Sequence, residues 1–256
     1  GAHRGVNSFY YEDLDGSWED RDKDGYHDYH GWGANAGPEI VVSWVYPSRA
    51  NAILELKHFF NKAHAYYTGQ LKVRDRGLVV IHSDWARDMD GHQNYFGQLS
   101  TIYGASGVER LGGHDASNQA IEVDGDDYLA KITSTYETTV FYTHASWSTH
   151  YPDKNKIHLS KIVGSPGGNL ITFIGGCHSG DVLQAKDQLT IATSYVMRNP
   201  VGLAATGTTW SYGPEELARV TGALDQGKTL GEAWLIKQKH RNTPAYYCKR
   251  YGASFD

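Results

Sequence analysis

The chain has 256 residues, 40% hydrophobic and 21% charged, a composition typical of a folded globular protein and not of a disordered or collagen-like one. Acidic residues outnumber basic ones by 29 to 24, the formal net charge is −5, and no basic cluster stands out, so we expect no nucleic-acid partner. The apolar runs are far shorter than the roughly 20 residues that cross a bilayer, so we also expect no membrane span.

After an Asp-rich N-terminal segment, residues 1–37, short apolar runs alternate with segments of helical periodicity. Unbroken apolar runs of this kind are typical of strands that are covered on both faces. The predicted strands are residues 40–45, 78–81, 140–143, 170–174 and 201–204. The predicted helices are residues 49–67, 126–136, 185–197, 214–224 and 230–240.

The first predicted helix has the clearest periodicity. Ser48 is placed to cap its N-terminus, and Pro214 suits the first turn of a later helix. Apolar residues of the first helix recur every three or four positions and predict a buried stripe: Ile53, Leu56, Phe60, Ala63 and Tyr67.

The alternation of strands and helices predicts an α/β fold with a mostly parallel central sheet and helices on both faces. We expect residues 38–256 to form the main domain and to make a single globular unit with segment 1–37. In such a sheet the chemistry lies just beyond the carboxyl ends of the strands.

Two of the predicted strands end in reactive side chains. His144 follows the strand at 140–143, and Cys177 follows the strand at 170–174 after a glycine pair, Gly175 and Gly176. We expect the glycines to allow a tight turn and a close approach of substrate. Neighbouring parallel strands would bring His144 and Cys177 to the same edge of the sheet.

This pairing suits nucleophilic catalysis. A free thiol has a pKa near ~8.5 and needs a base such as an imidazole to form a thiolate at neutral pH. The backbone N–H groups of Ala145 and Cys177 are candidates for holding the oxyanion of a tetrahedral intermediate. A structural interpretation stays open, in which Cys177 is a small buried residue or forms a disulfide with Cys248.

A hydrophobic block ending in His, followed by one ending in Cys, resembles the pattern of caspase-like cysteine peptidases, and within that group the chain is most similar to the gingipain family. The similar segments are residues 9–18, 38–43, 202–208 and 226–233. The resemblance implies a caspase-like three-layer α/β/α sandwich and a cysteine endopeptidase with Cys177 as nucleophile and His144 as general base. The chain departs from the family where Ala145 replaces the glycine that usually follows the catalytic histidine.

The resemblance also implies a protein or peptide substrate with a basic P1 residue, held by an acidic side chain. The candidates are Asp84, Asp88 and Asp181, with Trp210 as a wall of the pocket. Asp181 has an alternative role as the N-cap of the helix that follows it.

The N-terminal segment carries a second chemical signal, a calcium loop. Its carboxylates stand at positions 1, 3, 5 and 9 of the loop, with a glycine at position 6 and a backbone carbonyl at position 7. The predicted calcium ligands are Asp20, Asp22, Asp24, Tyr26 and Asp28. A structural calcium ion suits a secreted, extracellular protein.

Two other classes of function stay open. The segment after the strand at 78–81 could bind zinc and make the protein a metal-dependent hydrolase, through His82, Asp84, Asp88 and His92. Alternatively, the departure at Ala145 is compatible with a catalytically inactive, calcium-stabilised caspase-like binding module.

Overall fold

The computed structural model describes residues 9–21, 23, 29–31, 37–86, 94–209 and 217–241. The chain divides into two compact units, one formed by Gly1–Trp44 with Leu217–Asp256 and the other by Val45–Glu216. The prediction was different: a segment 1–37 and a domain 38–256 that together form one globular unit. Among the described residues, no helix is both long and apolar enough to cross a membrane.

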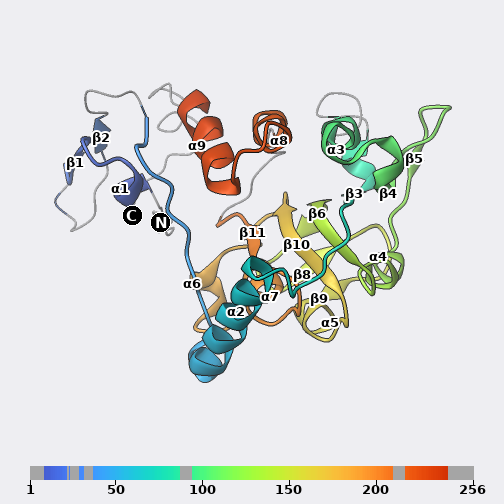
Figure 1. The fold of residues 1–256 in the computed structure, drawn as a ribbon, viewed down its shortest axis with the longest axis horizontal. Helices are drawn as coiled ribbons and strands as arrows, with labels where there is room; N and C mark the ends of the chain where they lie inside the picture. Colours follow the sequence, from blue (N-terminus) through green and yellow to red (C-terminus); the bar gives the residue numbers. More distant parts are fainter. Residues whose placement is uncertain are drawn as a thin grey trace. The chain divides into compact units, whose positions relative to one another are not determined.

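The second unit is built on a six-stranded sheet with the order β11-β10-β6-β3-β4-β5 (Figure 1). All neighbouring strands are parallel except β4 and β5. The strands are β3 (Gly77–Ile81), β4 (Val108–His114), β5 (Ala120–Ile121), β6 (Thr135–Tyr142), β10 (Gly168–Ile174) and β11 (Ala204–Thr206). The predicted α/β class and mostly parallel sheet are confirmed.

Helices lie on both faces of this sheet. Successive strand residues point to opposite faces. The ring of Phe141 contacts Tyr128 of α4 at 4.5 Å between centroids and belongs to the buried cluster that includes Tyr195 of α7. The ring of the next residue, Tyr142, lies 6.4 Å from the ring of Tyr95 of α3 between centroids, on the other face. The helices of this unit are α2 (Ala52–Tyr67), α3 (Tyr95–Tyr103), α4 (Gly125–Lys131), α5 (Leu159–Val163), α6 (Val182–Ala185) and α7 (Ile191–Met197).

A small antiparallel sheet follows directly from β6. Its strands are β7 (His144–Ala145), β8 (Thr149–Tyr151) and β9 (Ile157–His158). The hairpin between β7 and β8 therefore begins at His144, so the histidine has a fixed backbone at the end of the central strand.

The first unit contains short elements. They are α1 (Phe9–Glu12), β1 (Ser17–Glu19), β2 (Tyr29–Gly31), α8 (Ala218–Asp225) and α9 (Leu230–Arg241). The predicted strand at 40–45 is wrong. The segment instead attaches to α1, because the N–H groups of Glu39 and Ile40 donate to the carbonyl oxygen of Glu12.

Several other element boundaries differ from the prediction. The helix expected at 126–136 ends at Lys131, because Thr135 and Tyr136 begin β6. The helix expected at 185–197 is divided into α6 and α7, with Lys186 and Asp187 at positive φ between them. The strand expected at 201–204 begins at Ala204 as β11, and Pro214 lies outside the described residues.

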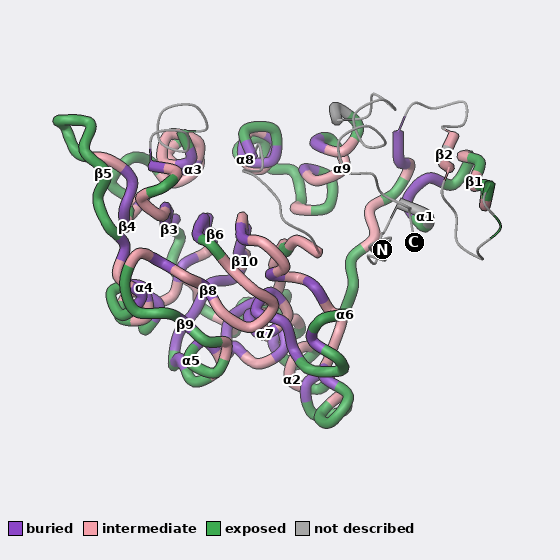
Figure 2. The backbone as a smooth tube through the Cα atoms, turned by 180° about the vertical axis from the view of Figure 1, so that it is seen from behind, coloured by how far each residue is buried: buried purple, intermediate pink, exposed green. Residues whose placement is uncertain are grey.

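The predicted apolar stripe of the first helix is also wrong. Exposed residues occur along α2 (Figure 2). Ile53 and Tyr67 are 85% and 86% exposed, and Phe60 is 59% exposed. The buried residues of α2 are instead Glu55 and Lys62. Polar contacts of these two side chains hold α2 against the rest of the unit, so the periodicity of its apolar residues does not identify the buried face.

Both buried side chains of α2 have several partners. Glu55 accepts hydrogen bonds from Ser48 N–H at 2.6 Å and Ser48 Oγ at 2.9 Å, and it pairs with Arg198 at 2.7 Å. Ser48 therefore stands at the N-terminus of the helical segment as predicted, but its hydroxyl donates instead of capping. Lys62 Nζ donates to the carbonyls of Val196, Asn199 and Gly202 at 2.6–2.8 Å.

A buried histidine of β8 lies in the core of the same unit. His150 is fully buried against Phe141, with 4.1 Å between ring centroids, and its Nε2 lies 3.4 Å from the hydroxyl of Tyr195. Its Nδ1 has no hydrogen-bond partner among the described residues. Burial lowers the pKa of His150 to about 3.

We predict that His150→Phe makes the protein less sensitive to acid. In the wild type, the unfolded state binds a proton at His150 below pH of about 6.5, whereas the folded state does so only near pH 3. Stability contributed by this group therefore falls as pH is lowered through that window, by up to about 1.4 kcal/mol per pH unit. Urea unfolding at several pH values between 7 and 4 measures the difference.

The matched control is His64→Phe, which replaces an exposed histidine of α2. The interpretation is wrong if this control flattens the pH dependence as much as His150→Phe does, or if His150→Phe leaves it unchanged.

Candidate active site

Three neighbouring strands of the sheet end at one edge. Ile81 of β3 is paired with Tyr142 of β6, and Phe141 of β6 is paired with Ile174 of β10. The residues that follow these strands therefore lie at the same edge of the sheet, and they include Asp84, His144 and Cys177. The predicted placement of the histidine and the cysteine on neighbouring strands agrees with this register.

The imidazole of His144 is held by a carboxylate. His144 Nε2 lies 3.0 Å from Asp84 Oδ2, and the Trp85 ring lies 4.2 Å from the His144 ring between centroids. Asp84 and Trp85 belong to a short 3-10 helix, η2 (Ser83–Trp85), which begins directly after β3. Because Nε2 is engaged, Nδ1 is the nitrogen of His144 that is left for proton transfer.

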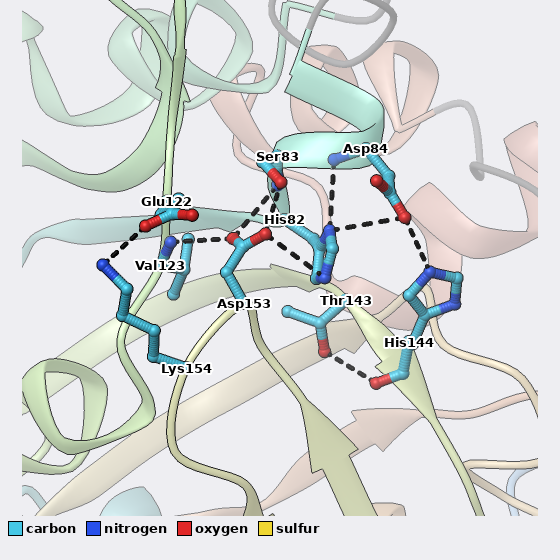
Figure 3. A network of polar contacts seen from close by, with 9 residues as sticks. All are labelled: His82, Ser83, Asp84, Glu122, Val123, Thr143, His144, Asp153 and Lys154. Atoms are coloured by element: carbon cyan, nitrogen blue, oxygen red, sulfur yellow. Dashed lines mark hydrogen bonds and ion pairs between the residues drawn. The ribbon is translucent and has the colours of Figure 1, made fainter.

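A second imidazole, His82, and a second carboxylate, Asp153, lie beside this pair (Figure 3). His82 Nδ1 accepts a hydrogen bond from the N–H of Asp84 at 3.1 Å, and His82 Nε2 lies 3.4 Å from Asp153 Oδ1. Since Nδ1 is the acceptor, the proton of a neutral His82 is on Nε2, where it faces Asp153.

Asp153 is held as a carboxylate by its neighbours. Burial alone would raise its pKa, but hydrogen bonds from Ser83 Oγ and from the N–H groups of Val123 and Ser83, with His82 nearby, lower the pKa overall. The carboxylate is thereby fixed in position and orients His82.

Cys177 is a free, half-buried thiol in the turn after β10. The carbonyl of Gly176 accepts from Ser179 Oγ at 2.9 Å and from Thr208 Oγ1 at 2.6 Å, which fixes the backbone before the cysteine. His178, directly after it, has φ of 54°, a left-handed conformation that is uncommon for residues other than glycine. Such backbone strain persists where the surroundings hold it and is frequent at functional sites.

The two glycines before Cys177 have a different role from the one predicted. Neither has a positive φ. A Cβ on Gly175 would overlap the ring of Tyr142, and a Cβ on Gly176 would lie 2.5 Å from Ala145 Cβ and 2.8 Å from the carbonyl oxygen of Thr143. The glycines thus allow close approach of β6 and its extension, and the space beside them is filled by protein.

Ala145 fits the strand without strain. It is in β7, opposite His150 of β8, and it has no positive φ. The next residue, Ser146, donates its N–H to Thr149 at 2.8 Å. Because bonded and non-bonded pairs alternate in an antiparallel ladder, the N–H of Ala145 points out of the hairpin, away from β8. Among the described residues, neither this N–H nor that of Cys177 donates a hydrogen bond, so both stay candidates for an oxyanion site.

The carboxylates predicted to bind a basic P1 residue have other partners where they are described. Asp84 is engaged with His144. Asp181 caps α6, because its Oδ1 accepts from the N–H of Gln184 at 3.0 Å and its Oδ2 lies 3.0 Å from His178 Nδ1. The alternative capping role of Asp181 is therefore confirmed. Asp88 and Trp210 lie outside the described residues.

The predicted calcium ligands lie mostly outside the described residues. Only Asp20 of the set is described, whereas Asp22, Asp24, Tyr26 and Asp28 are not. Another group of carboxylates is described in the same unit: Asp13, Asp15 and Glu39, each with an oxygen within 4.8 Å of the others. Oxygen ligands of this type suit a hard cation such as calcium.

The predicted zinc ligands are partly brought together, in a different combination. His82 and Asp84 cluster with His144, and one ligand atom from each lies within 4.8 Å of the others. Asp88 and His92 lie outside the described residues.

Two roles at the site are not evident from the sequence. One is the contact of Asp84 with His144: the sequence places Asp84 after a strand of the same sheet and suggests substrate binding, but the 3-10 turn directs its side chain to the imidazole. Asp153 gave no signal, because it is far along the chain from His82 and Ser83 and reaches them only through the fold.

No protein-family model and no curated protein matches this chain. Functional conclusions therefore depend on the site itself.

We predict that Asp181→Ala lowers the free energy of unfolding by about 1–2 kcal/mol, because the N-terminus of α6 loses its cap. Asp181→Asn is the matched control, since the amide keeps an acceptor oxygen for the N–H of Gln184. Chemical denaturation measures both variants. Equal destabilisation by the two substitutions would show that the negative charge, and not the cap, is what matters at this position.

Proposed function

We propose that the protein is a secreted cysteine endopeptidase of the gingipain-like, caspase-like type, which hydrolyses peptide bonds through Cys177 and His144. The observation that supports this proposal is the shared register of β3, β6 and β10, which brings a carboxylate, an imidazole and a free thiol to one edge of the sheet. A nucleophile, a base and a group that orients the base are the three parts that this chemistry needs.

In the proposed mechanism, Nδ1 of His144 takes the proton of the Cys177 thiol as the sulfur attacks the peptide carbonyl carbon. The N–H groups of Ala145 and Cys177 stabilise the oxyanion that forms. The imidazolium then protonates the leaving amine, and the carbonyl carbon stays bonded to sulfur as an acyl-enzyme. Water, deprotonated by His144, attacks this thioester and releases the acid and the thiol.

Asp84 acts on the imidazole and not on the substrate. Its bond to Nε2 favours the tautomer in which Nδ1 is unprotonated, and its charge stabilises the imidazolium that forms during the reaction. A basic P1 preference would then depend on Asp88, because Asp84 and Asp181 are both engaged.

We predict that Cys177→Ala abolishes cleavage of a broad peptide library and leaves the fold intact, as judged by circular dichroism. Asp84→Asn should lower kcat/KM by roughly 10²–10⁴-fold, because the imidazole loses the carboxylate that orients it. Mass spectrometry of the peptide products, with acyloxymethyl ketones directed at lysine and arginine as thiol probes, measures both.

The matched control is Asp127→Asn, which removes an exposed carboxylate of α4. Cleavage by Cys177→Ala at the wild-type rate would end the peptidase proposal. Loss of activity in Asp127→Asn equal to that in Asp84→Asn would show that the effect of Asp84 is not specific to its contact with His144.

We also propose that a structural calcium ion binds the first unit, through the Asp20–Asp28 loop, with Asp13, Asp15 and Glu39 as a second group of suitable oxygen ligands. Several carboxylates close together repel one another, and a divalent cation offsets this repulsion. The ion would have no part in the reaction.

We predict that EGTA lowers the melting temperature by about 5 °C or more, because removal of a ligand present at 100 times its Kd costs about 2.7 kcal/mol. Added calcium should restore it. Asp22→Asn should reproduce the loss if the loop holds the ion, and Asp15→Asn if the second group does. The calcium proposal is wrong if neither EGTA nor either variant changes the melting curve.

A further inference from the structure

We propose that His82, Asp84 and His144 form a zinc site, and that zinc bound there reversibly blocks the histidine of the proposed active site. The regulatory part of this inference rests on the proposed function, whereas the binding part does not. The three side chains come from the ends of two adjacent strands, β3 and β6, and each places one ligand atom within 4.8 Å of the other two.

The separations of Asp84 Oδ2 from the two imidazole nitrogens are close to those in a tetrahedral zinc site. Asp84 Oδ2 lies 3.0 Å from His144 Nε2 and 3.8 Å from His82 Nδ1. In a tetrahedral site with bonds of about 2.0–2.1 Å, ligand atoms are roughly 3.3–3.4 Å apart. Binding an ion would therefore change these two separations by only roughly 0.3–0.5 Å.

The protonation state of His82 also suits a metal. Its Nδ1 accepts a hydrogen bond from the N–H of Asp84, so this nitrogen carries a lone pair and would exchange that bond for the metal. Its Nε2 faces Asp153, at 3.4 Å. A carboxylate behind a ligating histidine fixes the ring and raises its basicity, as is usual at zinc sites.

Asp153 is itself held in the position from which it can orient His82. Its side chain is only 8% exposed, and three hydrogen bonds from Ser83 and Val123 hold it (Figure 3). By contrast, the side chains of Asp84 and His144 are 62% and 49% exposed, so an ion can enter from solvent and keep a water as its fourth ligand. Two nitrogen donors favour zinc over calcium or magnesium.

Zinc at this site and the proposed catalysis exclude each other. An ion on Nε2 of His144 leaves the ring proton on Nδ1, so that nitrogen can no longer accept the proton of the Cys177 thiol. The ion also occupies Asp84, which otherwise orients the ring. Removal of zinc would return His144 and Asp84 to their proposed catalytic roles, and no covalent bond would have to change.

Calorimetric titration of the full chain with zinc chloride, in buffer containing excess calcium, tests the binding part. The Cys177→Ala variant is titrated first, so that the thiol is not the ligand being measured. We expect one zinc ion per chain. His82→Ala and Asp84→Ala should weaken binding at least tenfold, and Asp153→Asn by about 10–100-fold. His64→Ala, an exposed histidine on α2, is the matched control and should bind zinc like the parent.

Absence of zinc binding in Cys177→Ala, or equal weakening in His64→Ala, would overturn the site. Circular dichroism of each variant shows whether a loss of binding reflects unfolding. Asp153→Asn, which keeps all three ligands, tests the site even if a ligand variant fails to fold.

The regulatory part is tested on the active chain. Zinc should inhibit peptide cleavage over the concentration range in which it binds, and a chelator should restore the rate. Inhibition of Asp153→Asn should need about 10–100-fold more zinc. Activation by zinc, or binding without inhibition, would overturn this part. A chain that binds zinc but cleaves no peptide without it would refute the proposed function and leave the metal site standing.

Discussion

The in-register parallel pairing of β3, β6 and β10 is the constraint on which the second unit depends. Every residue of β3 is buried, so its backbone groups have the neighbouring strands as their partners in place of water. A slip by one residue would turn each side chain to the other face. Phe141 and Tyr142 would exchange layers, and His144 would move relative to Cys177. The packing of the core and the geometry of the site are therefore fixed by the same hydrogen bonds.

The edge of the sheet carries an alternating series of acids and imidazoles, from Asp153 through His82 and Asp84 to His144. The buried end is held rigidly, and the exposed end is open to solvent. A series of this kind can orient the imidazole of His144 for proton transfer. It can also bind a zinc ion, which then takes the place of the proton between Asp84 and His144. The same contacts thus support both proposals, and the thiol of Cys177 is what separates a peptidase from a simple metal site.

Much of the central sheet can be predicted from sequence, because buried parallel strands are continuous apolar runs; β3 and β10 were found in this way. The run at 40–45 has the same pattern but pairs with no strand of the described part of the chain, and its start is bonded to Glu12 instead. The buried face of α2 was predicted wrongly for a different reason. Glu55 and Lys62 are the side chains that this helix buries, and a hydrophobicity pattern does not register buried polar residues. His144 and Cys177 could be predicted because each ends a strand. The partner of His144 could not, because a 3-10 turn decides where Asp84 points.

The contact between Ala145 and Gly176 couples two positions that are far apart in the sequence. The edge has room for one β-carbon there, and the chain places it at 145. Homologous sequences should therefore keep glycine at 176 and a small residue at 145. A glycine at 145 would relieve only part of the crowding at 176, because the carbonyl oxygen of Thr143 stays in place. A search pattern for distant relatives should therefore pair a small residue after the histidine with glycine before the cysteine, and not rely on the two reactive residues alone.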